Sequence, residues 1–333
     1  MKAKLLLLFS FVFLSLALGE WVVRKLGYFP DESADSPITR SFNDLNHKKY
    51  YAVDSITGWR LLPGRYLLPV STSLTVTVNH DSSGFRVTGR NANDTTSKKL
   101  FLFGCSFTYG CYIADTATLA YRLQQGLNKA NVYDMAIPAY GDVQAFLSLR
   151  NQIAKGNIPD LVVLNYSVAH DQRNYLSKRW EKQISHETLS FKEAEIPYER
   201  LDEAGHPHLL YKKLDYHGIP LRQYSALANL LDDFGNKLDA SNNQEQDLSY
   251  VVIQQMDSLC KASHATFILA GISNDQFTRS ILQKSKDHGI ETVDLSTSVA
   301  DSFNEQLTPP DADIHRHYAD ALMARLKAAR FGN

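Results

Sequence analysis

One serine in this chain stands where a buried strand would deliver a nucleophile. Ser106 follows the apolar run Leu100-Phe-Leu-Phe103 and Gly104, and a further glycine, Gly110, comes shortly after it. A parallel strand buried on both faces consists of continuous apolar residues, and open α/β sheets bind ligands at the carboxyl ends of such strands. The segment therefore predicts a Ser106 hydroxyl at the edge of a sheet. A serine that only caps the next helix would have the same pattern.

Partners that could activate this serine lie near the other end of the chain. A serine hydroxyl becomes a good nucleophile when an imidazole removes its proton and a carboxylate orients that imidazole. The loop expected before a helix over 318–330 contains Asp311, Asp313 and His315. We predict a triad of Ser106, His315 and Asp313, with Asp311 as the alternative carboxylate. Aspartates that cap a helix beginning near a histidine are the simpler interpretation.

Four short blocks resemble the SGNH, or GDSL-type, hydrolase superfamily over roughly residues 99 to 330. Gly104-Cys-Ser106 is similar to the nucleophile block, with Cys105 where the family has aspartate. Asp134-Met-Ala-Ile-Pro-Ala139-Tyr-Gly141 resembles the second block, with Ala139 where a glycine donates its backbone N–H to the oxyanion. The third block appears over 161–171, with His170 in place of asparagine. Asp313-Ile-His315 resembles the fourth, although many relatives have one more residue between the two.

The resemblance implies a three-layer flavodoxin-like α/β fold and a serine esterase or acylhydrolase that works through an acyl-enzyme. Ser106 would be the nucleophile, His315 the general base and Asp313 the residue that orients it. The N–H groups of Ser106 and Ala139, with a neutral His170 side chain, would stabilise the oxyanion. No metal or organic cofactor is implied. An O-acyltransferase using the same residues is one alternative. A non-catalytic carbohydrate-binding or assembly protein is another, suggested by the departures at Ala139 and His170.

The composition is that of a globular protein with a sizeable core. The chain has 333 residues, is 44% hydrophobic and carries a net charge of -1, which gives no electrostatic footprint for nucleic acid. Its cysteines, Cys105, Cys111 and Cys260, are too few for a disulfide framework. Cys105 and Cys111 could pair in an oxidising compartment, but we expect buried thiols.

The first 27 residues predict export. Lys2 and Lys4 precede an apolar run over 5–19 that ends in small residues, as in a secretory signal peptide. Trp21-Val-Val23 extends the run close to the length that a bilayer requires. We expect an uncleaved signal anchor, through which the protein would contact a membrane. Cleavage, giving a periplasmic or secreted protein, is the alternative.

The remaining chain divides into a preface and a hydrolase domain. Residues 28–98 contain turn signals and alternating segments, which predict a β-rich preface segment of hairpins. Residues 99–333 alternate between strand and helix patterns, which predicts a parallel sheet with helices on both faces. The expected strands cover 100–103, 132–137, 161–166, 266–270 and 292–295; helices are expected over 116–128, 144–155, 225–238, 248–263 and 276–287.

Residues 171–222 interrupt this alternation and predict an inserted cap over the carboxyl edge of the sheet. Its aromatic residues could stack on sugar rings or pack within the cap; they include Trp180, Tyr198, Tyr211 and Tyr216. Together with export, they favour an acyl ester of a carbohydrate or another envelope-associated compound as substrate, for example an O-acetyl ester. The partner would be a small-molecule or polysaccharide ester and not a nucleic acid.

Overall fold

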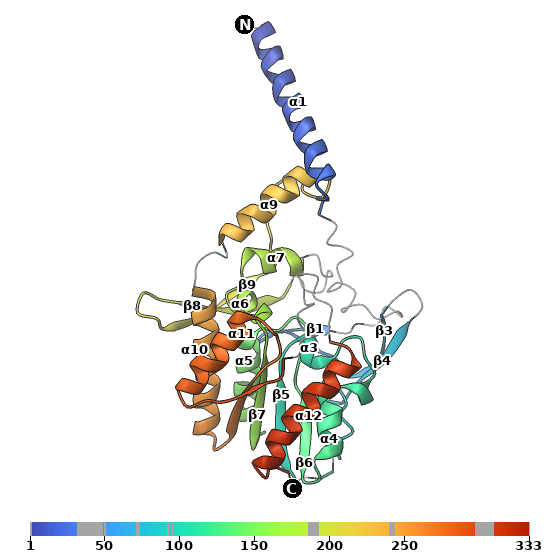
Figure 1. Cartoon of the computed structure of the whole chain (residues 1–333), viewed down its shortest axis with the longest axis vertical. Helices are drawn as coiled ribbons and strands as arrows, with labels where there is room; N and C mark the ends of the chain where they lie inside the picture. Colours follow the sequence, from blue (N-terminus) through green and yellow to red (C-terminus); the bar gives the residue numbers. More distant parts are fainter. Residues whose placement is uncertain are drawn as a thin grey trace.

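A five-stranded parallel sheet forms the centre of the molecule, in the order β11-β10-β7-β5-β6 (Figure 1). The computed structural model describes residues 2–31, 49, 51–70, 74–91, 93–94, 96–185, 193–239, 244–296 and 310–332. The strands are β5 (Lys98–Phe103), β6 (Ala130–Asp134), β7 (Leu161–Tyr166), β10 (Thr266–Gly271) and β11 (Glu291–Asp294). The chain passes from β5 outward to β6, and then returns to the other side of β5 with β7. This order confirms the predicted flavodoxin-like fold and places the topological switch point between β5 and β7.

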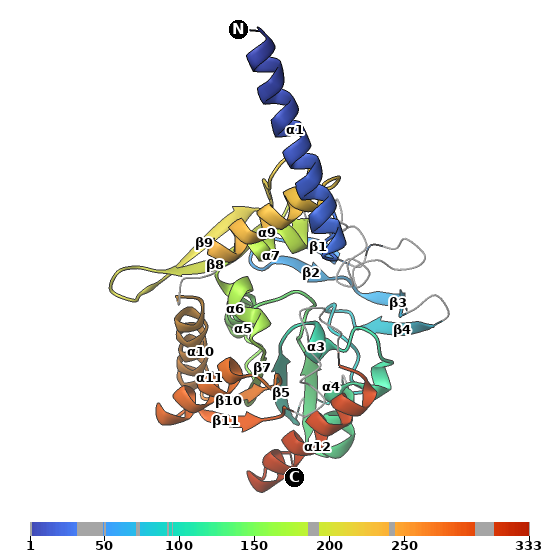
Figure 2. The same ribbon diagram turned by 45° about the horizontal axis from the view of Figure 1, so that its top comes forward.

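Helices cover both faces of the sheet, as predicted (Figures 1 and 2). One face packs against α4 (Leu119–Gly126) and α12 (Ala312–Ala328). The other packs against α5 (Asp142–Ala154), α10 (Gln244–Ala262) and α11 (Gln276–Asp287). Successive residues of β5 therefore alternate between two apolar cores, because neighbouring side chains of a strand point to opposite faces.

The preface consists of two antiparallel hairpins over its described residues. The first joins β1 (Tyr51–Asp54) to β2 (Gly58–Leu61), and the second joins β3 (Gly64–Pro69) to β4 (Thr75–His80). Trp59 is fully buried, and its indole N–H donates to the carbonyl of Pro138 over 3.4 Å. The hydroxyl of Tyr140 donates to the carbonyl of Trp59. The preface therefore packs directly on the loop that contains Ala139.

The described residues of the segment 171–222 form helices and a hairpin beyond the carboxyl edge of the sheet. They include the end of α6 (Ala169–Asn174), all of α7 (Lys178–Ser185), and the antiparallel pair β8 (Glu195–Leu201) and β9 (Pro207–Lys213). Trp180 is 1% exposed and lies against the guanidinium of Arg173, so it packs inside this region. Tyr211 is 40% exposed and is therefore the better placed of these two aromatics for contact with a ligand.

Two helices stand away from the sheet. The N-terminal helix α1 (Lys2–Lys25) projects from the rest of the molecule and is long and apolar enough to cross a membrane (Figure 1). The helix α9 (Ala226–Asp239) was expected among the helices that cover the sheet. It instead lies beside the end of α1 and against α7. Its sequence period is helical, but that period does not identify the element on which the helix packs.

Candidate active site

Ser106 lies directly beyond the carboxyl end of the central strand β5. It is the first residue of α3 (Ser106–Tyr109), with Cys105 at the N-cap position. A Cβ atom at Gly104 would lie 2.1 Å from Oγ1 of Thr108, so the turn before Ser106 requires glycine. Ser106 is partly exposed, and its hydroxyl forms no hydrogen bond with the described part of the chain. The structure thus places an accessible hydroxyl at the predicted sheet edge.

The loop of the second block is held against this turn. The N–H of Ile137 donates to the carbonyl of Gly104 over 3.2 Å. Ala139 has a φ of 69°, a left-handed conformation that glycine adopts freely and that costs alanine about 1 kcal/mol. The backbone conformation expected of a glycine is therefore kept at Ala139. Its role as an oxyanion donor stays a prediction.

His170 belongs to a buried hydrogen-bonded chain of polar side chains. It lies on α6, beyond the carboxyl end of β7, and is 1% exposed. Its Nδ1 lies 2.7 Å from Oδ1 of Asp142, and Oδ2 of Asp142 accepts a bond of 2.8 Å from Nδ2 of Asn174. Asp142 begins α5, so this chain joins the second and third blocks. No sequence pattern indicated this pair, because its members are 28 residues apart and Asp142 is also a plausible helix-start residue.

The charge of Asp142 makes His170 a cation at neutral pH. Burial alone would lower the pKa of His170, but the nearby carboxylate of Asp142 and the thiol of Cys105 raise it to about 9. The neutral His170 expected from the sequence is therefore wrong. In the imidazolium both ring nitrogens carry a proton. Nδ1–H donates to Asp142, and Nε2 finds no oxygen or nitrogen partner among the residues that the structure describes.

Cys105 lies close to His170, and the His170 side chain is among the groups that hydrogen-bond to its sulfur. Burial alone would raise the pKa of the Cys105 thiol, but the positive charges of His170 and Arg173, and hydrogen bonds to the sulfur, lower it to about 6. Cys105 and His170 are therefore expected to form a thiolate and imidazolium pair. Cys105, Cys111 and Cys260 are all buried free thiols, as expected, and the alternative pairing of Cys105 with Cys111 is not present.

The predicted pairing of Asp313 with His315 is wrong. The last helix begins at Ala312, earlier than expected, so both residues lie within its first turn. Residues two apart on a helix do not face each other. The side chain of Asp313 is 77% exposed and lies 3.1 Å from Arg316. Asp311 is not the carboxylate partner either, because it caps the helix by accepting bonds of 2.9 Å from the N–H groups of residues 313 and 314.

His315 is buried and links α12 to the start of α4 by a hydrogen bond. Its side chain is 0% exposed, and Nδ1 accepts a hydrogen bond of 3.0 Å from the N–H of Leu119 at the start of α4. Because Nδ1 accepts, the ring proton is on Nε2, which lies against the backbone of Phe107. Burial, with the charges of Arg86 and Arg122, lowers the pKa of His315 to about 3, so the ring is neutral. In this arrangement neither nitrogen offers a lone pair to Ser106, which contradicts the predicted role of general base.

A structural role for His315 gives a stability prediction. His315→Ala is expected to lower the free energy of unfolding by at least about 1–3 kcal/mol, because the buried N–H of Leu119 loses its acceptor. The effect should also depend on pH. The pKa of His315 is about 3 when folded and near 6.5 when unfolded, so the parent loses stability as the pH falls from 6.5 towards 3. Urea unfolding of both proteins across this range measures the difference. Equal unfolding midpoints at neutral pH would contradict the structural role.

Arg86 fixes the other end of the nucleophile turn. It is 1% exposed and donates to the carbonyls of Tyr109, Gly110 and Ile113, each over 2.5 Å. Its Nε also lies 2.9 Å from a carboxylate oxygen of Asp115, which is in the 3-10 helix η2 (Asp115–Ala117). The preface thereby holds the segment that follows Ser106, a role that sequence patterns did not predict.

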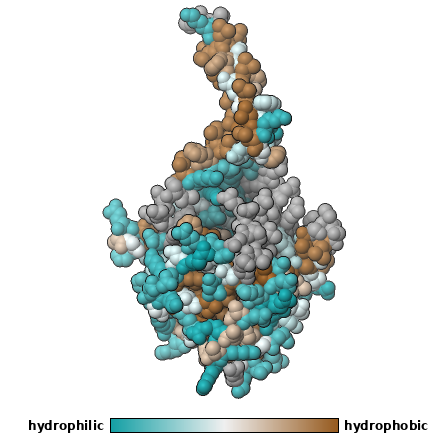
Figure 3. Space-filling view, viewed as in Figure 1, coloured by the Kyte–Doolittle hydropathy of each residue, from teal (hydrophilic) through white to brown (hydrophobic). Residues whose placement is uncertain are grey.

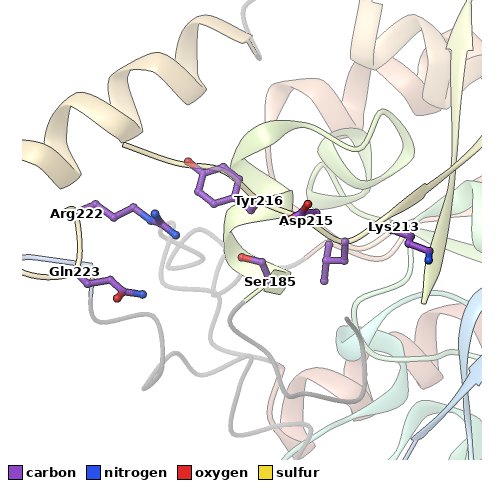
Figure 4. A pocket seen from close by; sticks show the side chains of 7 residues that line it. Ser185, Lys213, Asp215, Tyr216, Arg222 and Gln223 are labelled. Atoms are coloured by element: carbon purple, nitrogen blue, oxygen red, sulfur yellow. The ribbon is translucent and has the colours of Figure 1, made fainter. Parts of the chain in front are cut away.

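One cavity among the described residues lies in the cap and not at Ser106. It has a volume of about 450 Å³ and is lined by Ser185, Lys213, Leu214, Asp215, Tyr216, Arg222 and Gln223 (Figure 4). None of these residues belongs to the turn of Ser106 or to the loop of Ala139. Within the described ranges, no group of three or more His, Cys, Asp or Glu side chains is arranged to hold a metal ion.

Comparisons with known proteins find similar solved structures but no matching family model and no matching curated protein. A member of the lipolytic protein G-D-S-L family from Veillonella parvula has 9% identity and a TM-score of 0.41, over 69% of this chain and 99% of that one. A GDSL-like lipase from Bacteroides thetaiotaomicron has 12% identity and a TM-score of 0.38, over 72% and 93%. A catalytic mutant of an acetylxylan esterase from Geobacillus stearothermophilus has 12% identity and a TM-score of 0.37, over 69% and 94%.

Proposed function

We propose that this chain is an ester-bond hydrolase of the SGNH type that forms an acyl-enzyme on Ser106. The observation that carries the proposal is the Ser106 hydroxyl at the carboxyl end of β5, on a partly exposed residue and without a hydrogen-bond partner among the residues that the structure describes. His170 follows β7, the neighbouring strand, so the two residues flank the switch point where open α/β sheets bind ligands. The sequence resemblance over the first three blocks supports the same chemistry.

In the proposed reaction, Oγ of Ser106 attacks the acyl carbonyl and the bond between the carbonyl carbon and the ester oxygen breaks. The ester oxygen leaves as an alcohol, with the proton that the Ser106 hydroxyl gives up. The negative charge that develops on the carbonyl oxygen is stabilised by the N–H groups of Ser106 and Ala139 and by the positive charge of the His170 side chain. Asp142 holds His170 in position and keeps it charged. One such donor is typically worth about 10²–10³ in turnover. Water then attacks the acyl-enzyme and releases the acid.

A second candidate function is supported by one observation. His315 is engaged with the backbone of Leu119, so it does not activate Ser106 in this arrangement. This favours a non-catalytic protein that keeps the fold and binds a carbohydrate or an acyl ester. The two candidates differ in turnover and not in fold, so an activity measurement separates them.

We further propose that the substrate is an acyl ester of a carbohydrate or another envelope-associated compound. Retention of α1 as a membrane anchor supports this. The carboxylate of Glu20 accepts hydrogen bonds from the hydroxyl of Ser225 and from the N–H groups of Ala226 and Leu227. The end of α1 is thereby bound to the folded domain, which favours the anchor over a cleaved signal peptide. Intact mass measurement of the membrane-extracted protein would decide between them.

Hydrolysis of an ester panel by the full chain in detergent tests the proposed function. The panel should include aryl esters of short and long acyl groups and O-acetylated oligosaccharides. We expect turnover of short-chain esters. No turnover of any ester by a folded preparation would overturn the proposal in favour of the binding protein. Acyl transfer to an added carbohydrate that outpaces hydrolysis would instead identify an O-acyltransferase.

A further inference from the structure

Helix α9 exposes a continuous apolar stripe. Leu231, Phe234 and Leu238 are 52%, 60% and 59% exposed. They are spaced three and four residues apart, so they lie on one face of the helix. Scattered exposed apolar residues are ordinary on a protein surface, but a stripe along one helix face indicates a contact surface.

The opposite face of α9 is polar and packs on the protein. Asp232 and Asn236 are buried. Nζ of Lys182, from α7, lies 2.8 Å from Asp232, and the hydroxyl of Tyr216 donates to the same carboxylate over 2.6 Å. The amide of Asn236 donates to that hydroxyl over 2.7 Å. A helix on the surface of a soluble protein turns its apolar face inward. In α9 the polar face is turned inward and the apolar face is exposed.

The position of α9 identifies what covers the stripe. Its first turn is bound to Glu20, near the end of the apolar helix α1. A Cβ atom at Gly19 would lie 3.2 Å from the side chain of Leu227, so the two helices meet closely. Figure 3 shows the apolar surface of α1 reaching the region where α9 begins. The stripe is therefore continuous with the surface of a helix that can enter a bilayer.

Exposed aromatic side chains surround this junction. Trp21, Tyr28, Phe29 and Tyr224 are 59%, 48%, 62% and 77% exposed. Aromatic side chains of this kind concentrate at the boundary between lipid and water. The segment that follows α1 is fixed in place, because the amide of Asn229 donates to the carbonyl of Phe29 over 3.0 Å. The junction thus has the residues of a membrane interface.

We propose that α9 lies in the surface layer of the lipid bilayer that α1 enters, with Leu231, Phe234 and Leu238 among the lipid chains. An amphipathic helix in this layer buries its apolar face at the boundary of headgroups and acyl chains. The inference depends on retention of α1 and is independent of the chemistry at Ser106. It also fixes the orientation of the domain. In Figure 1, α3 and α6 follow the carboxyl ends of β5 and β7 on the side of the sheet that faces α9. The proposed active site would therefore face the membrane.

Depth-dependent fluorescence quenching tests this proposal in the full chain. The native cysteines are buried, so Phe234→Cys and Lys327→Cys each provide one exposed thiol for an environment-sensitive fluorophore. Residue 327 is in the last turn of α12 and is the control. The C-terminus, which follows α12, is at the end of the molecule opposite α1 (Figure 1). The proteins are reconstituted in phosphatidylethanolamine and phosphatidylglycerol vesicles, with and without brominated acyl chains. We expect a blue-shifted emission that brominated lipid quenches at position 234, and neither effect at position 327. Equal access of aqueous iodide to both labels would overturn the proposal.

A second set of variants tests whether lipid or another protein molecule covers the apolar stripe of α9. The fluorophore is attached to Leu238→Cys in two proteins: one with no other substitution, and one that also carries Leu231→Gln and Phe234→Gln. Both glutamine substitutions are at exposed positions, so they leave the buried polar face of α9 intact. We expect the double substitution to abolish quenching by brominated lipid. A label that brominated lipid never quenches, but that becomes shielded as the ratio of protein to lipid rises, would show that a second copy of the chain covers the stripe.

Discussion

Ser106→Ala is expected to lower ester hydrolysis by at least about 10³-fold, because the substitution removes the attacking oxygen from the proposed reaction. The variant should stay folded, since the hydroxyl of Ser106 bonds to no described residue. The measurement is the rate of hydrolysis of the best substrate in the ester panel, with the free energy of unfolding measured in parallel.

Ser263→Ala is a matched control for this substitution. Ser263 is also partly exposed, but it lies just beyond the end of α10, at the opposite edge of the sheet from Ser106. We expect parental turnover from this variant. Parental turnover from Ser106→Ala itself would end the proposal that Ser106 forms the acyl-enzyme.

Asp142→Asn is expected to lower turnover by about 10²–10³-fold, the loss that follows removal of one oxyanion donor. Without the carboxylate, His170 is neither held in position nor kept charged. Asp313→Asn, at the exposed carboxylate favoured by the sequence, should have no effect on turnover. The Asp142 effect should appear in kcat and not in KM, because the donor acts on charge that develops in the transition state. If Asp313→Asn lowers turnover more than Asp142→Asn does, Asp313 and not Asp142 would be the catalytic carboxylate.

Asp142→Asn also removes one partner of a buried ion pair, which typically costs about 3–5 kcal/mol of stability. If Asp142→Asn does not fold, substitutions of His170 test the same proposal. Asparagine can still donate to Asp142 and is the residue that the resembled family has at this position. We expect His170→Ala to lose most of the turnover and His170→Asn to recover part of it. Full activity in His170→Ala would assign the oxyanion to backbone groups alone.

The charge of His170 gives a pH prediction. Its pKa is raised from 6.5 to about 9, so the folded protein binds a proton that the unfolded chain releases between these values. The stabilisation is complete below pH 6.5 and is lost as the pH rises through about 9. The parent should therefore lose stability over this interval, and His170→Asn should lose less. Urea midpoints that change equally in both proteins would contradict a charged His170.

The sheet could be predicted from sequence because its strands have a strong signal. The run over 161–166 has six buried residues and is observed as β7 with the predicted bounds. Ser106 was placed correctly for the same reason, since a single turn separates it from β5. Features that follow from an adjacent apolar strand were predictable because local sequence determines them.

The partners of the imidazoles could not be predicted in this way. The Asp313-Ile-His315 spacing suggested a loop, but Asp311 is an N-cap that starts the helix one residue later and turns the two side chains apart. The fold brings His170 to Asp142, which is 28 residues away in the sequence. It also brings His315 to the N–H of Leu119, which is 196 residues away and donates to the His315 ring. Similarly, the helical period of α9 was correct, but the period by itself could not show that α9 lies beside α1 and α7 and not on the sheet.

Labelling with a fluorophosphonate ester, followed by intact mass measurement and peptide mapping, tests the central proposal most directly. Such a reagent reacts irreversibly with an activated serine and is trapped at the nucleophile. We predict one adduct per chain, located on the peptide that contains Ser106, and no adduct in Ser106→Ala. No adduct on a folded parent protein, or an adduct that persists in Ser106→Ala, would contradict the proposal that Ser106 is the nucleophile.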